Sequence, residues 1–212
     1  MDETIRKDEL LAAMLPDVPF DGWTGAAMAA AARRIGMDAA EMRALFPGGA
    51  RALVAWFSHW ADRLALETMA SRPLDGMKAS ERIALGVRTR LALLAPHREA
   101  VRRGLALLTL PQNAPLAARL LYDTVDALWY AAGDQATDFS FYTKRGILAG
   151  IYAATTLYWL DDRSPQGEAT AAFLARRLAE VRALPRIRAR LGRAFDNFPH
   201  PLRVLRHARA RF

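Results

Sequence analysis

The chain of 212 residues contains no cysteine, which excludes structural disulfides and thiolate metal sites. Histidine is also scarce, and none of its four copies forms an i, i+3 or i, i+4 metal-ligand pair with another histidine or a glutamate. These are His59, His97, His200 and His207. A glycine-rich phosphate loop and a nucleophile elbow are absent as well. The sequence therefore predicts a noncatalytic protein without a metal or cofactor.

Residues typical of strands are few, and no period-two alternation or internal repeat is present. Alanine, leucine and arginine dominate, and 52% of the residues are hydrophobic, which is ample for a core. Proline, glycine and capping residues divide the chain into segments of helical pattern. The expected helix caps include Thr24, Asp38 and Ser80, and a turn is expected at Phe20–Gly22. The expected helices are 5–15, 24–34, 38–45, 50–70, 80–95, 97–110, 115–132, 138–165 and 167–184. The sequence thus predicts an all-α fold.

Positive charge is concentrated at the C-terminal end. Residues 185–212 hold eight arginines and one acid, a net charge of +7, so residues 1–184 carry only +1 of the total +8. The basic character thus belongs to a tail and not to a DNA-binding domain. The first residues, MDETIRKDELL, are rich in acids, unlike a signal or transit peptide, so we expect a cytoplasmic protein or an already trimmed one.

The first three expected helices have the spacing of a helix-turn-helix, with a short break at Ile35-Gly36. The arrangement resembles the head of tetracycline-repressor-type regulators, followed by a helical ligand-binding body. The would-be recognition helix, 38–45, contains two acids and one base, which is unfavourable beside phosphates. We therefore expect a degenerate head over 1–49, a helical body over 50–184 and a basic tail over 185–212. A ligand-sensing transcriptional regulator is the alternative.

The segment 138–165, DFSFYTKRGILAGIYAATTLYWLDDRSP, is the most distinctive part of the sequence. Charged residues at both ends leave fewer uncharged positions than the ~20 that a membrane span needs. The pattern favours a central helix of the body that is apolar on nearly all sides. Asp161 and Asp162 are more simply a helix-end pair than an acid/base dyad.

Together with LYDTVDALWYAAGDQ and GLALLTLPQNAP, this segment resembles the accessory lipid-binding family of ubiquinone biosynthesis, the Coq nine family. The resemblance implies a repressor-like fold that binds isoprenoid lipid and presents quinone intermediates to the di-iron demethoxyubiquinone hydroxylase. It also implies a homodimer at a membrane surface and no specific nucleic acid. Phe141 stands where a tryptophan is usual in eukaryotic members, and the missing presequence points to a bacterial member, placed on the inner face of the cytoplasmic membrane.

Apolar residues at helical spacing in the body are ordinary core by pattern alone. The resemblance favours a lipid cavity instead. It implies that the body over 50–184 binds lipid, with an isoprenoid quinone or a phospholipid as the ligand. The predicted lipid-binding residues are Leu91, Leu94, Leu105, Leu108, Leu120, Leu121, Trp129, Ile147 and Ile151.

Asp138, Phe141 and Tyr142 follow a hydrophilic turn at the start of the central helix. Their spacing alone favours a helix cap plus core aromatics. The resemblance places them on the surface that meets the hydroxylase, where aromatic anchors carry much of the binding energy.

The tail has apolar residues at i, i+4, i+8 and i+11 from Ile187, with arginines on the flanks. The predicted membrane-binding residues are Ile187, Leu191, Phe195 and Phe198. A basic amphipathic helix with phenylalanines suits an anionic membrane surface. A solvated helix docked on the body, a nonspecific RNA-binding tail, and a membrane adaptor without any cavity are the other interpretations.

Overall fold

The computed structural model describes residues 2–133 and 139–181, and side chains for 2–133 and 143–181. Within them the secondary structure is helical with no strand, as the sequence predicted. The helices are α1 (Glu3–Met14), α2 (Val18–Asp21), α3 (Gly25–Arg34), α4 (Ala39–Leu45), α5 (Ala50–Ala70), α6 (Ala79–Leu94), α7 (Arg98–Leu108), α8 (Ala114–Ala131), α9 (Phe139–Asp161) and a last helix over 168–181. Short 3₁₀ turns lie at Ala95–His97, Pro111–Asn113 and Pro165–Gly167. The chain divides into two compact units, 1–174 and 175–212, and the arrangement below is that of the first.

Local capping fixes several of these helix boundaries. The Thr24 side chain accepts a hydrogen bond from Ala27 N, and Asp38 accepts from Ala40 N and Glu41 N, as predicted for both residues. The predicted cap at Ser80 is wrong, because α6 begins at Ala79 and the Glu81 carboxylate accepts from the backbone N–H of Lys78.

A second difference lies between α1 and α3. The sequence predicts a simple turn at Phe20–Gly22, but residues Val18–Asp21 form the short helix α2, which ends at Gly22 with a φ of 69°. A positive φ at this position suits glycine because it has no Cβ. The chain therefore turns at Gly22 as predicted, but the single turn of helix before Gly22 was not predicted.

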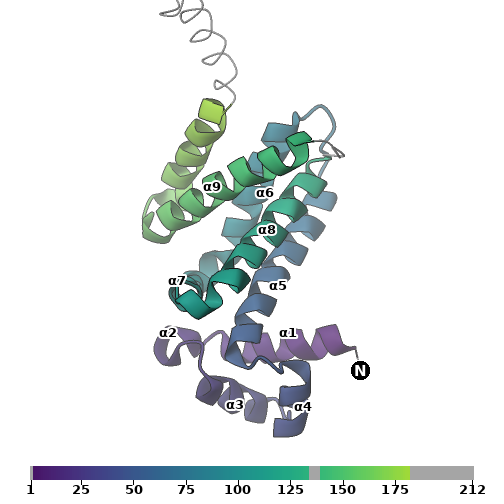
Figure 1. The fold of residues 1–212 in the computed structure, drawn as a ribbon, viewed down its shortest axis with the longest axis vertical. Coiled ribbons are helices and arrows are strands. Elements are labelled where there is room, and N and C mark those ends of the chain that lie inside the picture. The colour runs from purple at the N-terminus through teal and green to yellow at the C-terminus, as the bar shows by residue number, and fades with distance from the viewer. Residues whose placement is uncertain (1, 134–138, 182–212) are drawn as a thin grey trace, which may run out of the picture. The chain divides into compact units, whose positions relative to one another are not determined.

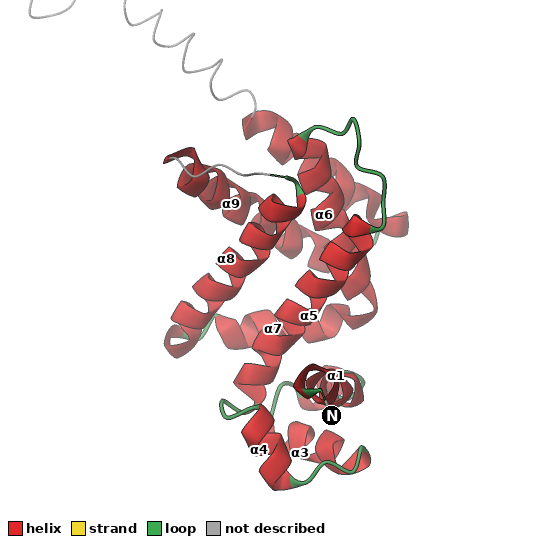
Figure 2. Cartoon of the chain, turned by 90° about the vertical axis from the view of Figure 1, so that its right-hand side faces the viewer, coloured by secondary structure: helices red, strands yellow, loops and turns green. Residues whose placement is uncertain are grey.

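Helices α1 to α4 gather at one end of this unit, and α5 leads from them into the group formed by α6, α7, α8 and α9 (Figures 1 and 2). The small α2 packs on α7. Two hydrogen bonds secure this junction: Trp23 Nε1 donates to Ala100 O at 2.9 Å, and Arg103 donates to Pro19 O at 2.6 Å. The head and the body therefore share buried contacts.

In the body, α5 packs against both α6 and α8, and α8 packs against α9. Their buried side chains follow helical stripes, such as Leu53, Phe57, Ala61 and Ala65 on α5. Two charged residues interrupt these stripes, Asp62 on α5 and Arg90 on α6, and both are buried. None of the helices in the described segments is long and apolar enough to cross a membrane.

The end of α9 is fixed by a buried carboxylate. Asp162 accepts hydrogen bonds from Ser164 N and Thr170 N, both at 2.8 Å, and from the Thr170 hydroxyl at 2.5 Å. These bonds from Ser164 and Thr170 hold the pKa of the Asp162 carboxyl well below its usual range. Asp161, in contrast, is the last residue of α9 and points to solvent beside Arg102. Asp161 and Asp162 thus mark the end of α9, as predicted.

We expect Asp162→Ala to lower the free energy of unfolding by about 2 kcal/mol at neutral pH, because three hydrogen bonds to a charged group are lost. The matched control is Asp161→Ala, for which we expect a change within about 0.5 kcal/mol. Because the folded pKa of Asp162 is depressed, its contribution is complete above the unfolded pKa of about 3.9 and declines as the pH falls below it. Urea unfolding at several pH values measures both effects. Equal losses for the two variants would contradict this role for Asp162.

Candidate functional site

A cavity of about 290 Å³ lies among helices α5 to α9, and its wall is mostly apolar. Each helix contributes residues spaced three or four apart, as expected for one face. The wall consists of Val54, Phe57 and Ser58 from α5, Arg90 and Leu94 from α6, Val101, Gly104, Leu105 and Leu108 from α7, Thr109, Ala117, Leu120, Leu121 and Thr124 on and before α8, and Tyr152, Ala153, Thr156 and Leu157 from α9. An apolar hollow with a few polar groups is the usual form of a small-molecule site.

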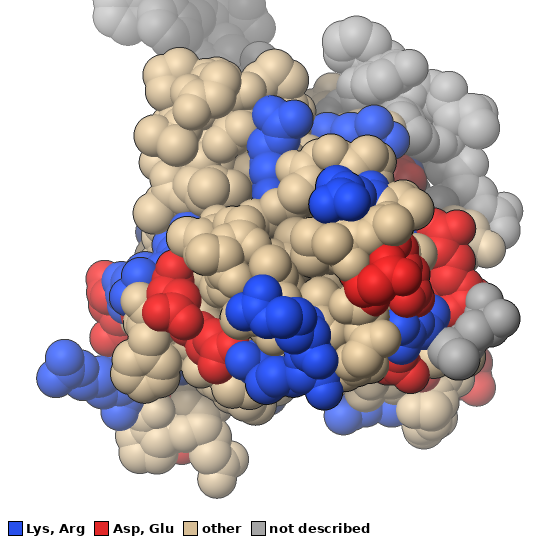
Figure 3. All heavy atoms as spheres, turned by 90° about the horizontal axis from the view of Figure 1, so that it is seen from below, with Lys and Arg blue, Asp and Glu red and all other residues tan. Residues whose placement is uncertain are grey.

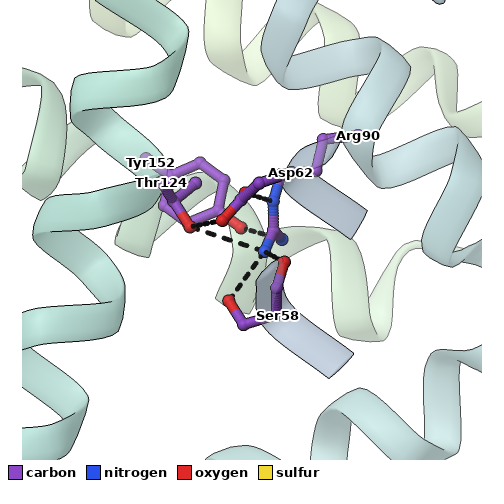
Figure 4. Close-up of polar contacts among 5 residues, drawn as sticks. All are labelled: Ser58, Asp62, Arg90, Thr124 and Tyr152. Atoms are coloured by element: carbon purple, nitrogen blue, oxygen red, sulfur yellow. Dashed lines mark hydrogen bonds and ion pairs between the residues drawn. The ribbon is translucent and has the colours of Figure 1, made fainter. Parts of the chain in front are cut away.

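The polar part of this wall is centred on the Arg90 guanidinium (Figure 4). Arg90 Nε donates to Asp62 Oδ1 at 2.6 Å, and Arg90 Nη1 donates to the Tyr152 hydroxyl at 2.5 Å. Arg90 Nη2 donates to the Ser58 hydroxyl and backbone carbonyl at 3.0 and 3.2 Å. The Thr124 hydroxyl donates to the second Asp62 oxygen at 3.1 Å. Four helices thus meet at one buried ion pair, which we call the Arg90 cluster: Ser58, Asp62, Arg90, Thr124 and Tyr152.

The Arg90 cluster is shielded from water. Arg90 and Asp62 are only 5% and 8% exposed, and a buried charge is tolerated when it is paired and hydrogen-bonded. Burial also raises the pKa of the Tyr152 phenol above its ordinary value, against the opposing effect of Arg90. Tyr152 is therefore a neutral hydroxyl at physiological pH and is able to donate a hydrogen bond.

A second hollow of about 520 Å³ lies elsewhere on the same unit. Three arginines contribute to its wall, Arg72, Arg88 and Arg98, together with Trp159 and Leu91. The guanidinium of Arg98 lies over the Trp159 ring at 4.6 Å from its centroid. This second hollow is more polar than the cavity among α5 to α9. The cavity among α5 to α9 is therefore the better candidate for an apolar ligand.

The predicted lipid-binding residues fall into three groups. Leu94, Leu105, Leu108, Leu120 and Leu121 lie on the cavity wall. Leu91 lies on the wall of the second hollow. Trp129, Ile147 and Ile151 line neither of these two hollows. On α9 the first residue of the cavity wall is Tyr152. The Trp129 ring instead lies against Lys144, whose Nζ is 5.6 Å from the ring centroid.

The sequence prediction missed the Arg90 cluster, although a signal for it exists. Arg90 occupies the buried stripe of α6 between Val87 and Leu94, and Asp62 occupies the buried stripe of α5 beside Ala61. Charges of opposite sign on two apolar stripes indicate a buried ion pair when the helices face each other.

The predicted partner and membrane residues lie outside the described part of the structure. Asp138 and the side chains of Phe141 and Tyr142 fall there, and so do Ile187, Leu191, Phe195 and Phe198. Their predicted roles stay predictions. Within 2–133 and 139–181, no group of three or more histidine, aspartate or glutamate side chains is placed to hold a metal ion.

The fold defines the class of protein first. A crystal structure of a TetR transcriptional regulator from Nitrosomonas europaea is similar, with a TM-score of 0.68 over 83% of this chain and 97% of that one. Its sequence is only 22% identical, so the likeness concerns the fold. This chain therefore has the tetracycline-repressor-like all-α fold that the sequence predicted.

The family follows from sequence comparison. Residues 114–185, which include α8 and α9, match the protein-family profile described as COQ9. The mitochondrial ubiquinone biosynthesis protein COQ9 of Rattus norvegicus is 36% identical over 81% of this chain and 57% of its own length. That of Drosophila melanogaster is 34% identical over 82% and 54%, and that of Schizosaccharomyces pombe is 29% identical over 86% and 72%. The chain belongs to the COQ9 family.

The similarity does not span the whole of these relatives. The chain covers a little over half of the rat protein. The relatives are mitochondrial proteins of animals and yeast, so they do not bear out the expectation of a bacterial member.

Proposed function

We propose that this protein is a noncatalytic lipid-binding accessory protein of ubiquinone biosynthesis that presents quinone intermediates to the demethoxyubiquinone hydroxylase at a membrane surface. The observation that carries the proposal is the apolar cavity of about 290 Å³, built partly by the segment that matches the COQ9 profile. Removing a polyprenyl chain from a bilayer exposes apolar groups, and each buried CH₂ contributes about 0.8 kcal/mol. A cavity lined by leucines replaces those contacts.

The size of the cavity limits how much ligand it encloses. A cavity of about 150 Å³ is large enough for benzene. A volume of about 290 Å³ therefore suits a ring-sized group with a short chain, and the remainder of a long polyprenyl tail would extend beyond it. This fits a protein that holds a lipid at a membrane surface rather than one that engulfs the lipid.

Native mass spectrometry combined with lipid extraction tests the proposal. The purified protein is expected to carry a prenylated quinone precursor or a phospholipid, or to take one up after delipidation. A folded, delipidated protein that binds no quinone and no phospholipid saturably would remove the basis for a lipid-binding role. It would then favour a membrane adaptor without a ligand.

A ligand-sensing regulator is the second candidate, supported by the fold of the Nitrosomonas protein. Helix α4 argues against this function, because three of its four exposed positions are alanines and only Arg43 could donate a hydrogen bond to a base edge. The Glu41 carboxylate pairs with Arg6 at 2.7 Å, and acidic and basic side chains are interspersed on this face (Figure 3). Selective retardation of one promoter fragment at about 0.15 M salt would favour the regulator.

The partner surface is proposed at Asp138, Phe141 and Tyr142. We expect Tyr142→Ala to weaken capture of the hydroxylase by about 2 kcal/mol or more, as an interface anchor does. The thermal midpoint of the variant is expected to stay nearly unchanged, since substitutions of exposed residues usually cost within about 0.5 kcal/mol. Pull-down and melting of the same variant measure both quantities. A large loss of stability with intact partner binding would move Tyr142 into the core.

Membrane contact is proposed for the basic tail, through Ile187, Leu191, Phe195 and Phe198. Each arginine near an anionic surface contributes about 1 kcal/mol of attraction. Flotation with liposomes is expected to require anionic lipid, to weaken with salt, and to fall on Phe195→Glu. Equal flotation of the full chain and a chain ending before Pro185 would place the contact elsewhere.

A further inference from the structure

Most of the polar residues on the cavity wall are buried. Arg90 is 5% exposed, Thr124 2% and Tyr152 7%. Its exposed wall residues include Leu157, which is 60% exposed, and Thr109. The interior end of the cavity thus combines hydrogen-bonding groups with buried apolar residues such as Phe57 and Leu94, and the apolar Leu157 stands at the mouth.

The interior end offers hydrogen-bond donors to a ligand. The Tyr152 hydroxyl accepts a hydrogen bond from Arg90. This hydrogen bond polarises the O–H bond of Tyr152 and makes it a better donor. One turn along α9, the Thr156 hydroxyl is on the same wall and is only 6% exposed. It makes no hydrogen bond of ordinary geometry among the described residues, although it lies near enough to the Tyr152 hydroxyl to act toward lowering the pKa of that phenol. A ligand oxygen at this point would give the Thr156 hydroxyl a well-formed hydrogen bond.

The charge of this end is already balanced. The Arg90 guanidinium is paired with the Asp62 carboxylate at 2.6 Å, so the Arg90 cluster has no net charge. A phosphate or carboxylate bound there would add an uncompensated buried charge, which is strongly unfavourable. A carbonyl or hydroxyl oxygen adds none and accepts the available hydrogen bonds.

We propose that the ligand enters this cavity polar end first: an uncharged, oxygen-bearing ring lies against Tyr152 and Thr156, and its apolar tail leaves past Leu157. This inference rests on the proposed lipid-binding function and specifies the head group and its orientation. The volume of about 290 Å³ agrees with it, because it admits a ring and a short chain. A phospholipid in the same cavity would have to place its charged head at the apolar mouth.

Three probes with the same short prenyl tail test this orientation on the full, delipidated chain: a prenylated benzoquinone, the plain prenyl hydrocarbon and the prenyl diphosphate. We expect the quinone to bind about tenfold more tightly than the hydrocarbon, from its hydrogen bonds. The diphosphate is expected to bind no more tightly than the hydrocarbon. The infrared carbonyl band of the bound quinone is expected to shift to lower frequency, as a hydrogen-bonded carbonyl does.

Two substitutions locate the effect. In Tyr152→Phe the preference of about tenfold for quinone over hydrocarbon is expected to disappear, together with most of the carbonyl shift. Thr156→Val, which keeps the shape of the side chain, is expected to reduce the same preference. The control is Tyr158→Phe, because Tyr158 is exposed on the same helix and stacks on Phe173, away from the cavity wall. It is expected to bind all three probes as the unmodified chain does.

The outcomes separate this inference from the proposed function. If the quinone and the hydrocarbon bind equally well, or if the diphosphate binds most tightly, the head-first orientation is wrong and the lipid-binding function stands. If the quinone preference survives both Tyr152→Phe and Thr156→Val, the orientation is likewise wrong. If none of the probes binds the folded protein, the lipid-binding function fails and the orientation fails with it.

Discussion

Replacing Asp62 with alanine is expected to lower the free energy of unfolding by about 3–5 kcal/mol. The reason is the burial of its partner. Arg90 is 5% exposed, and without Asp62 its charge would lie in the protein interior with only neutral neighbours. The Thr124 hydroxyl would lose its acceptor at the same time. Urea or guanidinium denaturation measures the loss, provided that unfolding is two-state.

Two comparisons show whether the buried charge is the cause. The double variant Asp62→Leu with Arg90→Met removes both charges, and we expect it to be clearly more stable than Asp62→Ala alone. The exposed ion pair of Glu3 and Lys7 provides the matched control, since Glu3→Gln is expected to change stability by less than about 0.5 kcal/mol. If the double variant were as unstable as the single one, the loss would come from packing and not from an unpaired charge.

Filling the cavity is expected to abolish ligand binding while leaving the fold intact. Ala153 lies on the cavity wall in α9, and Ala153→Phe places a phenyl ring into a volume of about 290 Å³. Because about 150 Å³ is enough for benzene, the ring fits without forcing the helices apart, and it takes the space that a ligand ring would use. We expect binding of a prenylated quinone to fall at least tenfold and the unfolding midpoint to change little.

The control for this variant is Ala154→Phe. Ala154 is the next residue of α9 and is not part of the cavity wall. It adds the same ring on another face of the helix, so ligand binding is expected to persist. Equal binding by the Ala153→Phe variant and the unmodified protein would show that the ligand occupies a different place, such as the hollow beside Arg88.

The helices were predictable from sequence because their determinants are local. Thr24 and Asp38 cap the helices that follow them, and α5 runs over Ala50–Ala70 as its pattern indicated. The short α2 escaped prediction because four residues are too few to establish a helical period. The start of α6 was misplaced because a serine near a helix start is a common cap, and here the Glu81 side chain serves instead.

The cavity was only partly predictable. Sequence spacing identifies the apolar stripe of a helix, and five of the nine predicted lipid-binding residues lie on the cavity wall. Spacing does not distinguish a stripe packed against a neighbour from one that borders a hollow, because that depends on the distances between helices. Ile151 illustrates the limit, since it is buried on α9 directly before Tyr152 and yet does not line the cavity.

The Arg90 cluster depends on helix pairing, which sequence spacing alone does not give. Arg90 and Asp62 are 28 residues apart, and Tyr152 is 62 residues from Arg90. On its own helix, each of these residues is a polar side chain within an apolar stripe, and its partner becomes evident only when the helices are packed together. The family resemblance suggested a cavity but carried no information about this polar interior end.

Titration of the delipidated full chain with a short-tailed prenylated benzoquinone tests most directly the proposal that the cavity among α5 to α9 binds lipid. We expect saturable binding with one ligand per chain and a negative heat-capacity change, because apolar surface is buried on binding. We also expect that Ala153→Phe removes this binding and that Ala154→Phe does not. Folded protein that shows no saturable binding of the quinone, or binding that Ala153→Phe leaves unchanged, would contradict this proposal.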